Sequence, residues 1–115
     1  MDQVCIVLPI LPGKSNDARA FHRELEATRK ADYDRSERRL GMSKEVWYLA
    51  SSPAGDQLIV YIEGANFNNA MQQFVASKND FDLWFKRRLL EVTGSDLNDP
   101  PPDMTWPEML SRFEA

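Results

Sequence analysis

The chain has 115 residues, of which 43% are hydrophobic and 28% are charged, a composition typical of one globular domain spanning residues 1–115. Its net charge of −4 argues against a surface built to bind nucleic acid. One cysteine and one histidine cannot supply a disulfide or a metal cluster, so we expect no metal site. No apolar run approaches the roughly 20 residues that span a bilayer, and the first residues lack the pattern of a secretion signal. We therefore expect a soluble cytoplasmic protein with neither a membrane nor a nucleic-acid partner.

The first forty residues predict a strand followed by one long helix. Residues 4–11 are apolar and rich in β-branched side chains, which is typical of a strand buried on both faces, although Pro9 cannot donate to a sheet. Residues 16–40 contain no Gly or Pro, and opposite charges recur at helical spacing until Gly41. Such a helix reaches roughly 35 Å, which exceeds a typical strand. Its second half must therefore overhang the sheet or be covered by another element.

The rest of the chain predicts a hairpin and a broken second helix. Residues 46–51 and 57–63 are strand-like and flank a Pro- and Gly-containing turn. Two helices are then expected: one is capped by Asn66 and stops near Ser77, and the other is capped by Asp80 and ends at Gly94. The prolines of residues 95–107 predict an extended connector. Residues 108–115 alternate as in a strand but also carry capping-box spacing for a helix, so both remain open.

This order of elements predicts an α+β fold of the ferredoxin-like βαββαβ type, with a four-stranded antiparallel sheet. Its helices would cover one face of the sheet only. The predicted strands, however, carry apolar side chains on both faces. We therefore expect a two-fold homodimer in which two sheets pack face to face.

Three segments of the sequence resemble the dimeric α+β-barrel superfamily: Leu8–Lys14 (strand, Pro-Gly-Lys, helix), Ser77–Gly94, and the Pro-Glu-Met-Leu of residues 107–110. Within it, the chain resembles a group of small bacterial proteins of uncharacterised function. The resemblance implies a homodimer of ferredoxin-like subunits in which residues 108–115 supply the fourth strand. Members include cofactor-free monooxygenases, haem-degrading enzymes, cyclases, dehydratases and ligand-sensing domains, often with a cavity between sheet and helices, so the fold alone does not give the function. The haem-degrading branch uses a helical histidine, but no matching motif surrounds His22, and we expect no cofactor.

One stripe of the long helix changes from apolar to polar along its length. At about 100° per residue, its members lie within roughly 40° of Leu25; they are Ala18, Phe21, Leu25, Arg29, Asp32, Ser36 and Arg39. Arg29 and Asp32 are three residues apart, a spacing at which they can pair with each other. In a pocket, Asp32 would instead act as a base, Arg29 would bind an anion and Ser36 would contact the ligand. The alternative is that this half of the helix overhangs the sheet and is solvated.

Histidine and aromatic side chains supply the other candidates. His22 is the default general acid or base, since its ordinary pKa lies near neutrality, although such a histidine also commonly borders a core. Tyr33, Tyr48 and Tyr61 can donate a hydroxyl group to a ligand, and Trp47 can line an aromatic pocket. The alternative for these aromatic residues is the core or the dimer interface. Cys5, inside an apolar strand, is expected to be a packed, inert thiol.

No phosphate-binding loop, nucleophile elbow or metal motif is present in the sequence. Two functional hypotheses remain. The first is a homodimer that binds a small organic molecule between helix and sheet, with or without cofactor-independent catalysis. The second is a dimeric binding or accessory module without enzymatic activity.

Overall fold

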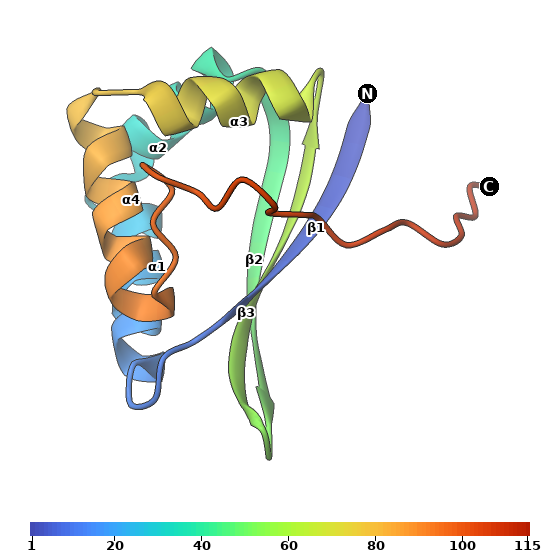
Figure 1. Cartoon of the computed structure of the whole chain (residues 1–115). Helices are drawn as coiled ribbons and strands as arrows, with labels where there is room; N and C mark the ends of the chain where they lie inside the picture. The colour runs from blue at the N-terminus through green and yellow to red at the C-terminus, as the bar shows by residue number, and fades with distance from the viewer.

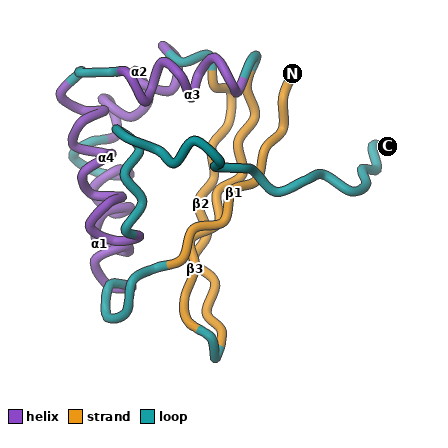
Figure 2. Tube along the Cα trace, in the orientation of Figure 1, coloured by secondary structure: helices purple, strands orange, loops and turns teal.

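Three antiparallel strands form one sheet whose inner face is covered by four helices, in a computed structural model that describes residues 1–115 (Figure 1, Figure 2). The strand order is β1-β3-β2, so β3 is central and both outer edges are free. No helix is long and apolar enough to cross a membrane. The elements are β1 (Asp2–Pro9), α1 (Ser15–Glu26), α2 (Lys30–Arg39), β2 (Met42–Ser52), β3 (Gly55–Gly64), α3 (Phe67–Ala76) and α4 (Asp80–Thr93).

The single long helix predicted for residues 16–40 is wrong, because the chain breaks between α1 and α2. Ala27 has φ −121° and ψ −101°, outside the helical region, and the N–H of Arg29 donates to the carbonyl of Glu24, five residues earlier. The break turns α2 so that Tyr33 and Ser36 become buried. A straight helix would have carried these side chains past the sheet. The turn therefore replaces the predicted overhang with contacts to β2 and α4.

Alternation along the strands divides the sheet into a covered face and a bare face. On the covered face, Ile6 of β1 pairs with Val60 of β3, which pairs with Trp47 of β2. On the other face, the same register aligns Val7 with Ile59 and Tyr48, and no helix covers this row (Figure 1). Val7 is 41% exposed and Tyr48 is 60% exposed in the single chain.

Cys5 corrects one expectation about the strands. It lies on the bare face and is exposed in the single chain, rather than packed as predicted. The reason is the alternation of β1, which points even-numbered residues toward the helices and odd-numbered residues away from them.

The main core lies between the inner face of the sheet and helices α1 and α4. Phe21, Leu25 and Leu89 are almost fully buried there, and the Phe21 ring meets that of Phe85 edge-on at 5.1 Å. Helix α4 begins one residue earlier than the sequence suggests, because the side chain of Asn79 accepts hydrogen bonds from the backbone N–H groups of its first turn.

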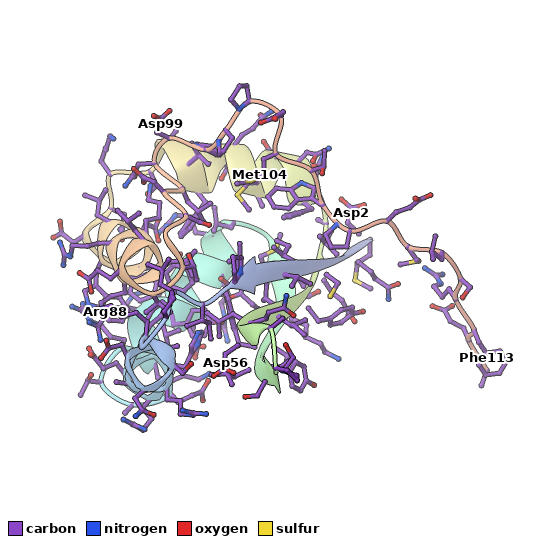
Figure 3. The ribbon with its side chains drawn as sticks, turned by 60° about the horizontal axis from the view of Figure 1, so that its bottom comes forward. Asp2, Asp56, Arg88, Asp99, Met104 and Phe113 are labelled. Atoms are coloured by element: carbon purple, nitrogen blue, oxygen red, sulfur yellow. The ribbon has the colours of Figure 1, made fainter.

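The end of the chain forms no fourth strand in this structure. Residues 94–107 run without regular structure from the end of α4 to the β1 side of the sheet (Figure 1). Trp106 packs on Phe67 there, at 5.4 Å between ring centroids. Asp2, at the start of β1, accepts a hydrogen bond from the N–H of Phe67. The tail therefore reaches β1 beside its first residue, Asp2. A fourth strand antiparallel to β1 would have to begin at the other end of β1, beside Pro9. Residues 108–115 extend away from the body, and Phe113 is 88% exposed (Figure 3).

Candidate functional site

An apolar cavity of about 80 Å³ lies between the sheet and the helices. Of its 20 lining residues, 17 are hydrophobic, so polar chemistry is confined to the remaining three, Ser36, Glu37 and Glu45. The connector after α4 closes one side of this cavity with Met104 and Trp106 (Figure 3). The other walls come from the inner face of the sheet and from α3 and α4: Ile6, Leu8, Val60, Ile62, Phe67, Met71, Phe74, Phe81 and Phe85.

Two carboxyl groups meet on the wall of this cavity. Glu37 lies near the end of α2, and Glu45 points inward from β2. Glu45 accepts hydrogen bonds from the Tyr33 hydroxyl group and, at 3.0 Å, from the indole N–H of Trp47. The Glu37 carboxyl group lies beside that of Glu45, and its buried Oε2 has no hydrogen-bond partner. Two like charges side by side in a buried site repel each other, so ionisation of both carboxyl groups is disfavoured.

Burial and mutual repulsion keep a proton on this pair at neutral pH. Burial, followed by the charge of Glu45, raises the pKa of Glu37 to about 9. Burial also raises the pKa of Glu45, while the donors Tyr33 and Trp47 oppose that rise by stabilising its carboxylate. Burial and the Glu45 charge raise the pKa of Tyr33, whose hydroxyl group therefore stays a donor. The pair as a whole therefore holds a proton, and the donors Tyr33 and Trp47 favour Glu45 as its charged member.

Glu45 lies where three spaces meet. Besides the cavity, it borders a groove of about 690 Å³ between α1 and β2, which Trp47 also lines. It also borders, with Glu37, a polar surface depression of about 290 Å³. The carboxyl pair therefore separates an apolar interior from water.

His22 lies in the groove, but it lacks the property that made it a candidate acid or base, a pKa near neutrality. Its ring lies between those of Phe21 and Trp47, with centroids 4.7 and 4.8 Å away. Burial lowers the pKa of His22 to about 4, so the imidazole is neutral at pH 7. Its buried Nε2 has no hydrogen-bond partner.

The polar half of the predicted stripe is divided by the turn before α2. Asp32 is 37% exposed and pairs with Arg29, at 3.6 Å, and with Arg35, so it lies on the surface and not in the cavity. The Arg29 guanidinium lies over the Trp84 ring, at 4.5 Å from its centroid. Ser36 is 2% exposed and borders the cavity, as the pocket hypothesis requires.

Ser36 also belongs to a polar network that joins α2 to α4. Its hydroxyl group donates to the buried carboxylate of Asp82 at 2.7 Å. Asp82 also accepts from the hydroxyl group of Ser77, at 2.6 Å, and pairs with Arg39. Because every polar group in this network has a hydrogen-bond or ion-pair partner, the network fixes the position of α2 relative to α4.

The predicted aromatic residues lie on both sides of the sheet. Tyr33 and Trp47 are brought together at Glu45. Tyr48 points to the bare face and borders the groove. Tyr61 is also on the bare face, where its hydroxyl group donates to Glu63 at 2.6 Å.

The carboxyl pair itself was missed by sequence reasoning, although one signal was present. Glu45, Trp47 and Leu49 alternate along β2, so an inward Trp47 places Glu45 inward as well. Glu37 follows Tyr33 by four residues and shares its side of α2. These two spacings place both carboxyl groups beside Tyr33 and Trp47.

Comparison with known proteins gives one informative likeness. No protein-family model matches the chain, and no curated protein matches it in sequence. Among solved structures, tetracenomycin F2 cyclase from Streptomyces glaucescens, described as a type-II polyketide cyclase, superposes with a TM-score of 0.59 over 100% of this chain and 99% of the cyclase. The two chains share one fold. They are 14% identical, so the likeness shows the fold alone.

The shared fold supports the predicted α+β class. The resemblance to the dimeric α+β-barrel superfamily stays a prediction. The finer resemblance, to a group of small bacterial proteins, stays a prediction.

Proposed function

We propose that this protein binds a small, mainly apolar organic molecule between its helices and its sheet. The observation that carries the proposal is the cavity itself, an apolar wall interrupted only by Ser36, Glu37 and Glu45. Ligand sites typically combine such a wall with a few convergent polar groups. One water occupies roughly 10–15 Å³ by this measure, so about 80 Å³ holds a group of several heavy atoms. The adjoining groove holds the remainder of a larger molecule.

The same geometry favours chemistry that needs no cofactor. A carboxyl group that holds a proton and a carboxylate that accepts one lie together on the cavity wall. The structural neighbour is described as a polyketide cyclase, and cyclisation of a carbonyl compound proceeds by proton transfers of this kind. We therefore favour an enzyme with acid–base chemistry.

A binding or accessory module without enzymatic activity is the second candidate. Its support is the placement of the two catalytic candidates from the sequence, since Asp32 is a surface ion pair and His22 is neutral at pH 7. Ligand binding without turnover is the result expected of such a module.

The working form that we propose is a homodimer joined through the bare face of the sheet. This face presents a continuous apolar row, Val7, Ile59 and Tyr48, which helices leave uncovered. The occupant that we infer is a second copy, because the tail passes the β1 edge toward this side and carries exposed apolar residues (Figure 1). In a face-to-face pair, the same row meets itself about a two-fold axis.

Binding is tested by titrating the protein with the bicyclic ketone 2-tetralone and following tryptophan fluorescence, since Trp47 and Trp106 line the cavity. The variant Ala70→Leu fills the cavity wall and should weaken binding at least tenfold. The matched control is Ala76→Leu, an exposed position on the same helix, which should bind as the wild type does. Circular dichroism checks that both variants fold. No saturable binding by the wild type, or equal affinity in Ala70→Leu, would overturn the proposal.

A further inference from the structure

We propose that Glu37 and Glu45 are a catalytic acid–base pair that moves a proton from the carbon next to a carbonyl group of a ligand held in the apolar cavity. The inference rests on the proposed function, because it needs a ligand in that cavity. It adds the reaction class, the substrate class and the two residues that carry the reaction. Neither residue is part of the site that the sequence predicted.

The placement of the pair is the first argument. Both carboxyl groups border the cavity, and all its other lining residues except Ser36 are hydrophobic. The Ser36 hydroxyl group is already donated to Asp82, at 2.7 Å. The carboxyl groups are therefore the polar atoms that a carbonyl compound in the cavity would meet. A carboxylate with little water around it is also a stronger base than one in solution.

The fixed orientation of Glu45 is the second argument. Its Oε2 accepts from the Tyr33 hydroxyl group and from the Trp47 indole, donors that come from α2 and from β2 itself. Both donors hold the charged form of Glu45, so this group is the base. Glu37 holds the proton and is the acid. Each residue thus has one role before the ligand enters.

The step balances without an oxidant or a reductant. The Glu45 carboxylate takes the proton from the carbon next to the carbonyl group, and the electron pair of the broken C–H bond forms the C=C bond of an enol. The Glu37 carboxyl group gives its proton to the carbonyl oxygen. Glu45 is then protonated and Glu37 charged, and the transfer of one proton from Glu45 to the neighbouring Glu37 restores the starting state. The product is an enol, the nucleophile that a ring closure onto a second carbonyl group requires.

The polar depression on the outer side gives the pair a route to water. Glu37 and Glu45 line it together, so a proton taken from the ligand can be exchanged with solvent without crossing the apolar cavity. The charged groups around the pair come from four elements, and Glu26 is the one on α1. The others are Lys30, Asp34 and Arg38 on α2, Lys44 on β2, and Asp82 on α4.

The experiment follows the hydrogens next to the carbonyl group of 2-tetralone in D₂O by proton NMR. The wild type should speed their exchange for deuterium well above the buffer rate. Glu45→Gln should lose at least 100-fold of this acceleration, and Glu37→Gln at least tenfold, while both still bind the ketone by fluorescence. The matched control is Glu91→Gln, a surface carboxylate of α4 that pairs with Arg88 and should exchange as the wild type does.

The outcomes separate this inference from the proposed function. If the wild type binds 2-tetralone and leaves its exchange at the buffer rate, the pair is not catalytic and the binding function stands. If Ala70→Leu fails to weaken binding, the ligand lies elsewhere and the proposed function fails. A readout without ligand tests the pair directly: carbon NMR of labelled glutamate should show one carboxyl group titrating near pH 9, and this signal should move toward ordinary values in Glu45→Gln. Ordinary titration of every glutamate would overturn the inference.

Discussion

The Glu37 side chain is buried where its charged form is disfavoured, so the stability of the protein must depend on pH through the ionisation of this group. Its pKa is about 9 in the folded chain against an ordinary 4.5, so the folded state binds more protons than the unfolded state between these values. Stability from this group is complete below about pH 4.5 and is lost as the pH rises toward 9.

We expect Glu37→Gln to remove this loss, since an amide keeps the shape of the side chain but does not ionise. At pH 8 to 9 the variant should exceed the wild type by about 1–3 kcal/mol in the free energy of unfolding, and the gain should fade toward pH 5. Urea unfolding at several pH values measures this. Parallel profiles for the two proteins would show that Glu37 is charged throughout.

His22 gives the opposite pH dependence at the same scale. Burial between two aromatic rings lowers its pKa from 6.5 to about 4, so the folded state binds fewer protons than the unfolded state over this range. The stability contributed by the neutral ring is present above about pH 6.5 and is lost as the pH falls toward 4.

The variant His22→Phe cannot take up this proton and also removes the unpartnered Nε2. Between pH 6.5 and 4, the wild type should lose about 1–3 kcal/mol more stability than the variant does. Thermal unfolding across this range measures the difference. An imidazole signal that titrates near pH 6.5 by NMR would contradict the prediction.

At the scale of elements, the junction of α3 and α4 depends on one buried cation. The side chain of Lys86 is fully buried, and its Nζ donates to the carbonyl oxygens of Phe74 at 2.8 Å, of Ser77 at 3.0 Å and of Val75 at 3.3 Å. These carbonyl groups lie at the C-terminal end of α3, and that of Phe74 also accepts from the backbone N–H of Ser77, at 3.2 Å. A cation at the C-terminal end of a helix also interacts favourably with the helix dipole. Burial lowers the pKa of Lys86, which is the cost of this arrangement.

We expect Lys86→Met to destabilise the protein by about 2–4 kcal/mol, because it removes the buried donor that these carbonyl groups share. The matched control is Arg87→Met, an exposed neighbour on α4, which should change stability by less than about 0.5 kcal/mol. Urea unfolding at pH 7 compares the three proteins. Equal losses in both variants would mean that the lysine contacts contribute nothing.

Elements with their own local signals could be predicted from the sequence, and elements set by distant contacts could not. The hairpin, α3 and α4 each follow a turn or a capping residue, and Asn66 caps α3 as expected, accepting from Asn69 at 3.0 Å. The break at Ala27 has no Gly or Pro to mark it. It arises because Tyr33 and Ser36 are buried against other elements, which is a tertiary effect.

The candidate site was only partly predictable for the same reason. Trp47 and Tyr33 were expected near a ligand, and the structure brings both to Glu45. For Asp32 the sequence left a pocket wall and a solvated surface both open, and the structure places it on the surface, in ion pairs with Arg29 and Arg35. Glu37 was not singled out because its burial depends on how α2 is tilted, which the sequence does not state.

At the scale of the whole molecule, the two faces of the sheet carry different features. Its inner face carries the cavity and the carboxyl pair, whereas its outer face carries an apolar row that serves no purpose within one chain. The three-stranded sheet leaves the β1 edge free, and the tail leaves the body beside that edge. Within a homodimer, both the row and the exposed tail gain a partner, which removes apolar surface that a single chain leaves in water.

This reasoning predicts that Ile59→Lys separates the dimer. Ile59 lies on the central strand, between Val7 and Tyr48, so the two-fold axis would bring two added charges close together in an apolar interface. Sedimentation velocity at micromolar concentration should show a dimer for the wild type and a monomer for the variant. Gln72→Lys adds the same charge at an exposed position of α3 and should remain a dimer.

The Cys5 thiol reports on the same face by an independent route. It is exposed in the single chain and would be covered in a face-to-face dimer. A thiol reagent should therefore react slowly with the wild type and with Gln72→Lys, but at least tenfold faster with Ile59→Lys. Because the bare face is not part of the core, circular dichroism of the variant should match that of the wild type. A wild type that sediments as a single chain, with a rapidly reacting Cys5, would mean that the apolar row is not a dimer interface.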